Sequence, residues 1–330
     1  MASPPALADV IAVFWVALSA ALALVTASPP GATRAAAADA VPKVGLVTTV
    51  PATRDAFVGG LQDLGYQDGR NIVLDWRRAP EDGAGDIEAL VRQAPACLVL
   101  PGPFRLARGL SLTTTIPIVA VDLESDPVAS RFVASLARPA GNVTGIFLDL
   151  PELAGKQIQL LREAVPRLTR LAVLWDDRVS GPQLRAAEAA AQAAGITLIP
   201  VAIRSAADLD DVVDRAMKGR PQALLVLTSP DVFAARVRIA QEAQRHRLPA
   251  ASIFPAFADA GGLLGYGPDL LEMYRQAAKY VDRILKGARP SDLPIERPSK
   301  FQLVVNLKAA RTLGLTIPAS LLARADKVVE

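Results

Sequence analysis

Residues 171–201, LAVLWDDRVSGPQLRAAEAAAQAAGITLIPV, contain the pattern that decides the fold. The stretches 171–174 and 197–201 are short apolar runs typical of buried strands, and residues 183–194 between them carry apolar side chains at helical spacing. A strand, a helix and a second strand in this order predict two parallel strands joined by a right-handed crossover. The stretch therefore predicts an α/β fold.

The same unit recurs along the chain in two series. In the first, apolar runs at 44–47, 72–74, 97–100 and 118–121 predict strands, and segments such as 55–64 and 86–93 predict helices. The second begins after residue 145 with a helix at 153–164. It continues with helices at 208–218 and 232–245, strands at 223–227, 250–253 and 263–266, and a long helix at 270–286. We expect two doubly wound, parallel-sheet (Rossmann-like) lobes around a cleft, with lobe 1 at 41–145 and lobe 2 at 146–266.

Composition limits the chemistry that the chain can perform. The 330 residues include one cysteine, Cys97, and one histidine, His246. These counts exclude an intrachain disulfide and argue against a His-rich metal centre or a catalytic Cys–His dyad. The net charge of +3 comes from scattered basic residues, so no nucleic-acid partner is expected. The first predicted strand lacks a following GxGxxG fingerprint, and no phosphate-loop lysine motif occurs, so no cofactor and no metal are expected.

The first forty residues are typical of a targeting segment. Residues 11–27, IAVFWVALSAALALVTA, carry no charge and are followed by small residues. This pattern predicts a secretory signal peptide cleaved near Ala38 or Ala40. An uncleaved N-terminal anchor and a buried helix of a soluble protein remain alternatives, because the region after Met1 has no basic residue and contains Asp9.

Polar and aromatic residues gather where the predicted strands end, and this is where open parallel sheets bind ligands. The strand-end segments are 48–49, 102–104, 122–126, 175–177, 228–231, 254–257 and Tyr266. Ser229 before Pro230 and Asp126 before Pro127 also mark expected helix starts, whose free N–H groups can hold a carboxylate. Helix capping and core packing are the structural alternatives for these residues. Together, these polar and aromatic residues at the strand ends favour a small zwitterionic ligand in the cleft over a polymer.

Several blocks of the sequence resemble exported substrate-binding proteins of ABC transporters in the group related to tryptophan- and tyrosine-binding components. The resemblance rests on residues 57–66 (FVGGLQDLGY) with 69–72 (GRNI), 115–119 (TIPIV), 126–128 (DPV), 135–145 (SLARPAGNVTG), 260–268, 280–287 and 314–318. Asp176–Asp177 departs from the family pattern, in which Asn-Pro is frequent at this place.

The resemblance implies a type I periplasmic-binding-protein fold, in which residues 267–330 return to lobe 1 and then to lobe 2. It also implies a monomeric periplasmic protein that captures a small molecule, such as an amino acid, by lobe closure and serves a permease with its ATPase. Any membrane contact would run through the permease or an uncleaved N-terminal segment. The implied ligand-binding candidates are Thr48, Thr49, Phe104, Asp126, Trp175, Asp176, Ser229 and Tyr266. A ligand-sensing module for a membrane receptor or kinase and, less favoured, an exported α/β enzyme stay open.

Overall fold

A computed structural model describes residues 41–48, 50–78, 84–122, 124–148, 151–204, 208, 211–298 and 300–330. The chain divides into two units, Met1–Ala40 and Val41–Glu330, and the fold described below is that of the second unit. The expected signal peptide or anchor and the candidate Thr49 lie outside the described residues. Within the part that the structure describes, no helix combines the length and apolar character needed to cross a membrane.

The first lobe is built on a five-stranded parallel sheet of order β2-β1-β3-β4-β5. Its strands are β1 (Lys43–Thr48), β2 (Val73–Arg78), β3 (Cys97–Pro101), β4 (Ile118–Asp122) and β5 (Val143–Phe147). The three central strands are buried along their whole length, except that Lys43 at the start of β1 is half-buried. Both faces of this sheet are therefore covered, as the continuous apolar runs in the sequence predict.

Helices cover the two faces of the first sheet. They are α2 (Pro51–Asp63), α3 (Ala84–Arg92), α4 (Gly102–Leu112) and α11 (Leu270–Leu285). Leu46 and Val99 pack in a cluster with side chains of α2 and α11, whereas Leu98 and Leu100 pack with side chains of α3 and α4 on the opposite face. Alternate strand residues therefore serve two separate packing layers.

The second lobe contains a seven-stranded sheet of order β12-β11-β10-β9-β8-β6-β7. Its strands are β6 (Arg170–Asp176), β7 (Thr197–Ile203), β8 (Ala223–Val226), β9 (Ala250–Ser252), β10 (Leu264–Pro268), β11 (Phe301–Asn306) and β12 (Lys327–Val329). The strand pairs are parallel except for β10 and β11, which are antiparallel. The fold class predicted from the sequence is confirmed, with the difference that the second sheet is mixed.

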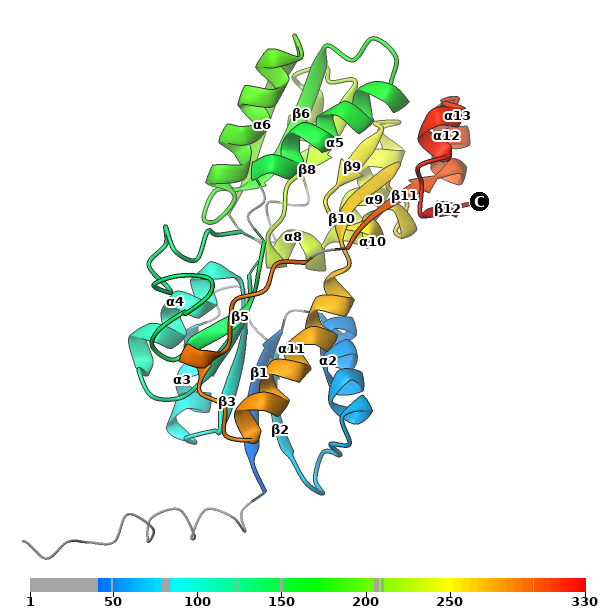
Figure 1. Cartoon of the computed structure of the whole chain (residues 1–330). Helices are drawn as coiled ribbons and strands as arrows, with labels where there is room; N and C mark the ends of the chain where they lie inside the picture. The colour runs from blue at the N-terminus through cyan, green and yellow to red at the C-terminus, as the bar shows by residue number, and fades with distance from the viewer. Residues whose placement is uncertain are drawn as a thin grey trace, which may run out of the picture. The chain divides into compact units, whose positions relative to one another are not determined.

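The helices of the second lobe also form two layers. One layer holds α5 (Pro151–Ala164), α6 (Gly181–Ala193), α12 (Leu307–Leu313) and α13 (Ala319–Leu322); the other holds α7 (Val212–Met217), α8 (Pro230–Ala234), α9 (Arg236–Arg245) and α10 (Pro255–Asp259). Leu171 and Val173 of β6 pack in the first layer, and Ala172 and Leu174 pack in the second. Figure 1 shows α5 and α6 on one face of this sheet.

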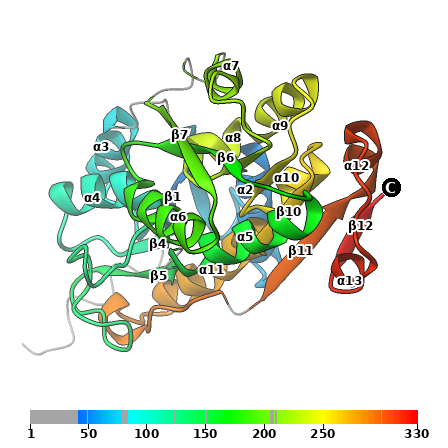
Figure 2. The ribbon, with the colours of Figure 1, turned by 90° about the horizontal axis from the view of Figure 1, so that it is seen from above.

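The chain passes between the lobes three times. It leaves the first sheet after β5, returns after β10 so that α11 packs along α2, and crosses again before β11 joins the second sheet. Figures 1 and 2 show α11 beside the first sheet and the elements α12, α13 and β12 at the outer edge of the second. The segment 293–296, which leads to the third crossing, is fixed to β5, since Thr144 of β5 donates a hydrogen bond to the Leu293 carbonyl at 2.8 Å.

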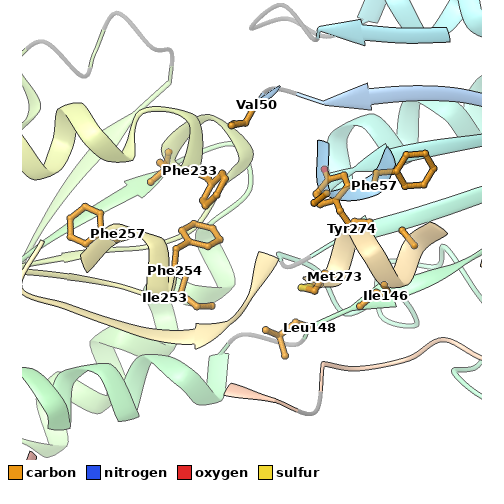
Figure 3. Close-up of a cluster of buried hydrophobic side chains, with 14 of the residues drawn as sticks. Val50, Phe57, Ile146, Leu148, Phe233, Ile253, Phe254, Phe257, Met273 and Tyr274 are labelled. Carbon is orange, nitrogen blue, oxygen red and sulfur yellow. The ribbon is translucent and has the colours of Figure 1, made fainter. Parts of the chain in front are cut away.

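The apolar side chains of the two lobes meet in one buried cluster. Phe57, Met273 and Tyr274 belong to the first lobe, and Phe233 and Phe254 belong to the second (Figure 3). The rings of Phe233 and Phe254 pack edge to face with their centroids 4.5 Å apart. Three members of this cluster, Phe233, Phe254 and Tyr274, also line a small cavity where the lobes meet.

Four helix expectations differ from the structure. The predicted helix at 232–245 is two helices, α8 and α9, which meet at Ala235. Asp126–Pro127 starts a turn and not a helix, and Asp126 accepts hydrogen bonds from the Val128 and Ala129 N–H groups. The strand-end segments 102–104 and 254–257, where no helix was predicted, contain the first turns of α4 and α10, each with proline near its start.

Candidate functional site

A cleft of about 380 Å³ lies between the carboxyl ends of strands from both lobes. The first lobe contributes the first turn of α4, and the second contributes the loop after β6, the end of β7 and the start of α8. The lining residues are Gly102, Pro103, Phe104, Arg105, Asp176, Arg178, Val179, Arg204, Pro230 and Asp231. The cleft thus combines an apolar wall with charges of both signs.

A smaller cavity of about 30 Å³ adjoins the cleft at Gly102 and Pro230. Its polar lining includes Glu124 from the first lobe and Thr228 from the second, whose hydroxyl donates a hydrogen bond to Glu124 Oε1 at 3.3 Å. Both side chains are buried, so this bond links the two lobes out of contact with bulk water. Such a bond is worth more than an exposed one and favours the arrangement in which the lobes touch.

One guanidinium organises the wall that the second lobe contributes. Arg178 donates to Asp176 through Nε at 2.9 Å and Nη2 at 2.7 Å, and to Asp231 through Nη2 at 2.6 Å. Hydrogen bonds and charge from Asp176, and then from Asp231, raise the pKa of Arg178 despite its partial burial. Arg178 therefore ties the end of β6 to the first turn of α8 in a fixed geometry.

Burial raises the pKa of two further groups of the first lobe. Desolvation raises the pKa of Asp122 at the end of β4, while hydrogen bonds from Ser125 and from the Glu124 N–H act in the opposite direction. Desolvation also raises the pKa of Tyr274 to about 12, against hydrogen bonds with Thr48 and Thr53. These groups are held in buried hydrogen-bond networks on the first-lobe side of the site.

Gly102 permits a close approach of the two lobes. Its φ is +71°, and an ideal Cβ there would lie 3.0 Å from Cγ of Pro230 in the other lobe. An alanine would therefore meet both backbone strain and a steric contact across the cleft.

We expect Gly102→Ala to weaken ligand binding about tenfold. The variant should also lose about 1 kcal/mol of unfolding free energy, because alanine is strained in the left-handed backbone conformation. Gly314→Ala is the matched control, because Gly314 has φ +69° with open space around its Cβ position. The control should lose similar stability and keep its affinity. Calorimetric titration and denaturant unfolding of both variants check this, and equal affinities would show that lobe approach at Gly102 is irrelevant to binding.

The structure brings some of the sequence-predicted candidates to the site. Phe104, 55% exposed, and Asp176, 1% exposed, line the cleft, and Ser229 lines the smaller cavity while its hydroxyl accepts the Val232 N–H. Thr48 is buried behind the site and contacts Thr53, which lines the smaller cavity. The Ser229 hydroxyl therefore already accepts a hydrogen bond from one N–H group at the start of α8. Under the hypothesis that this helix start holds a carboxylate, that N–H group is not free for the ligand.

The remaining described candidates lie elsewhere. Trp175 and Tyr266 pack against the apolar layer of α5 and α6, and the Tyr266 ring stacks on Phe301 with centroids 6.2 Å apart. Asp126 holds its own turn through the two N–H groups described above. None of these three residues lines the cleft or the smaller cavity.

Sequence reasoning did not single out the charged groups that dominate the site: Arg105, Glu124, Arg178 and Asp231. Glu124 and Asp231 lay within the strand-end segments, and Arg178 follows one of them directly, so proximity to a strand end was an available signal. Arg105 is the fourth residue of an unrecognised helix. His246 contacts Asp214 of α7 at 3.0 Å and does not line the cleft. Among the described residues, no cluster of His, Cys, Asp or Glu suits a metal ion.

Two α/β lobes, three connecting crossings and a cleft at the strand ends define a two-lobed small-molecule-binding protein. The model of the ABC transporter substrate binding protein family matches residues 48–329. The chain therefore belongs to this family, as the sequence blocks indicated.

Individual relatives are similar over most of the chain. A tyrosine-binding protein of Clostridioides difficile is 20% identical over 269 residues, which cover 79% of this chain and 76% of the relative. The structure of a conserved domain protein from Vibrio cholerae superposes with a TM-score of 0.79 at 26% identity, covering 88% of this chain and 100% of that one. An ABC domain from Streptococcus pneumonia, solved in complex with L-Trp, gives a TM-score of 0.78 at 24% identity over 88% and 100% of the two chains.

Proposed function

We propose that this protein captures an amino acid in the cleft between its lobes and delivers it to a membrane permease driven by an ATPase. The observation that carries the proposal is the lining of the cleft, in which basic and acidic side chains face a common space of about 380 Å³ beside an apolar wall. A free amino acid carries both charges, and its side chain can contact Pro103, Phe104 and Val179. The tyrosine-binding relative and the L-Trp complex support the same ligand class.

In this proposal, each lobe contributes different residues to the ligand site. Phe104 would contact the ligand from the first lobe, while Asp176 would act by fixing Arg178 and Asp231 on the second. Ser229 would hold the start of α8 in place, and Glu124 would complete the lobe contact through Thr228. Because these groups come from both lobes, a ligand that contacts both stabilises the closed arrangement over an open one.

Membership of the same family supports a cellular setting for the proposal. The protein would work as a monomer in the periplasm after export by its N-terminal segment, and its closed lobes would present one surface to the permease. Deletion of its gene should then abolish uptake of the bound amino acid. Intact uptake with loss of a response to that amino acid would instead favour the sensory role.

Ligand-dependent thermal unfolding with the twenty amino acids, and with neutral sugars for comparison, tests the proposal. A cognate amino acid at about 100 times its Kd should add about 2.7 kcal/mol to the unfolding free energy. Small-angle scattering should then show a smaller radius of gyration with that ligand than without it. Stabilisation by a sugar alone, or by no member of the panel, would refute amino acid capture.

A further inference from the structure

We propose that Arg105 and the N-terminus of α4 together bind the carboxylate of the ligand. The inference rests on the proposed function, in that it takes the cleft as the site of capture, and it assigns one end of the ligand to one lobe. Two independent features of α4, its unpaired first turn and the side chain of Arg105, support it.

The first turn of α4 is open to an anion. The helix runs for 11 residues from Gly102, no side chain caps it at Pro101, and its first turn contains no acidic residue. The first N–H groups of a helix have no partner within the helix and carry the positive end of its dipole. Gly102, Pro103, Phe104 and Arg105 all line the cleft, so this end of the helix borders the ligand space.

The side chain of Arg105 is buried without a full set of partners. It is 6% exposed, and its Nε has no hydrogen-bond partner within the described part of the chain. Its Nη2 lies 4.0 Å from Asp231 Oδ1, and the other oxygen of Asp231 accepts a hydrogen bond from Arg178 at 2.6 Å. Burial lowers the pKa of the Arg105 guanidinium, and Asp231 offsets this effect. A buried guanidinium is costly unless its donors are bonded.

The other two arginines of the cleft are already engaged by carboxylates. Arg178 is bound to Asp176 and Asp231, and Arg204 donates to Asp177 at 2.7 Å. Among the described residues that line the cleft, Arg105 is thus the arginine whose Nε and Nη groups do not both donate hydrogen bonds to a protein carboxylate. The planar fork of arginine matches a carboxylate, which would accept from Nε and one Nη at once.

The neighbouring charges favour a carboxylate over a phosphate. Asp231 lies 4.0 Å from Arg105, and Glu124 lies close enough to act on its charge. A phosphate dianion would meet repulsion from both acids, whereas a carboxylate adds only a single negative charge beside Arg105. The ligand class is therefore a monocarboxylate, with its acid end toward the first lobe.

The test compares amino acids with their amides in the full chain. L-tryptophan and L-tyrosine are titrated against L-tryptophanamide and L-tyrosinamide, in the wild type, Arg105→Gln and Arg105→Lys. Loss of a buried, charge-assisted contact should raise the Kd of the free acid at least about 30-fold in Arg105→Gln, with partial recovery in Arg105→Lys. The amides should change less than about threefold. Arg108→Gln is the control, because Arg108 lies on the same helix, pairs with Glu88 and does not line the cleft.

A second measurement separates this inference from the proposed function. The Nε–H signal of Arg105, assigned by its loss in Arg105→Lys, is followed by NMR while acetate or an amino acid is added. A shift with acetate, but with no amino acid, supports the carboxylate site and refutes amino acid capture. Amino acid binding that Arg105→Gln leaves within threefold refutes the site and keeps the proposed function. No shift and no binding with any of these compounds refutes both.

Discussion

Replacing Gly145 with alanine is expected to lower the free energy of unfolding by about 3 kcal/mol or more. Gly145 lies in β5 with φ +136°, and an ideal Cβ there would lie 2.1 Å from the carbonyl oxygen of Ala120 in β4. The obstacle is a backbone atom of a buried neighbouring strand, so a side-chain rotation cannot relieve it. Accommodating the methyl group would require β5 to move away from β4 and to lose ladder hydrogen bonds.

Gly141→Ala is the control for this prediction, because it changes a glycine in the same sequence block. Gly141 has φ +81° and open space at its Cβ position, so only backbone strain of about 1–2 kcal/mol is expected. Chemical denaturation of both variants measures the difference. Equal losses would show that the tight approach of β5 to β4 does not explain the glycine at position 145.

Replacing Arg178 with methionine is expected to cost about 2–3 kcal/mol of unfolding free energy and to weaken ligand binding. The change leaves Asp176, which is 1% exposed, without its guanidinium partner and frees Asp231 from its position at the start of α8. Removing one member of a buried ion pair is costly because it strands the other charge. The Arg178 side chain is 35% exposed, so water offsets part of the loss, and the expected cost lies below that of a fully buried pair.

Two further variants define the origin of that cost. Arg289→Met breaks the pair with Asp292, whose side chains are 77% and 53% exposed, and should change stability by less than about 1 kcal/mol. The double variant Asp176→Asn with Arg178→Met should be more stable than Arg178→Met alone, because the fully buried side chain at position 176 then carries no unpaired charge. A double variant as unstable as the single one would mean that packing of Arg178, and not its charge, supports the loop.

The sequence pattern was sufficient for the fold class because most strands of both sheets carry a strong local signal, although β5, β11 and β12 were not predicted. Strands such as 97–100 and 171–174 are buried on both faces and are apolar without interruption, and the helices between them keep a regular spacing. The antiparallel pairing of β10 with β11 had no such signal. Its direction is set by the return of the chain from α11, which depends on tertiary contacts.

The site was only partly predictable for a related reason. Strand-end position was enough to predict that Phe104, Asp176 and Ser229 lie at the cleft or the smaller cavity, because it follows from parallel-sheet geometry alone. Whether Trp175 or Tyr266 faces the cleft or the helices depends on strand alternation and register, and both residues pack toward the helix layer. Arg105 becomes a candidate only once its burial and the missing partner of its Nε are known.

Capture of the ligand in the cleft between the lobes is central to the proposed function. A crystal structure of the protein grown with the amino acid that stabilises it most against thermal unfolding measures this directly. We predict electron density for the ligand between the first turn of α4 and the Arg178–Asp231 pair, with contacts to both lobes and the carboxylate at Arg105. Ligand density outside this cleft, or contacts confined to one lobe, would contradict the account.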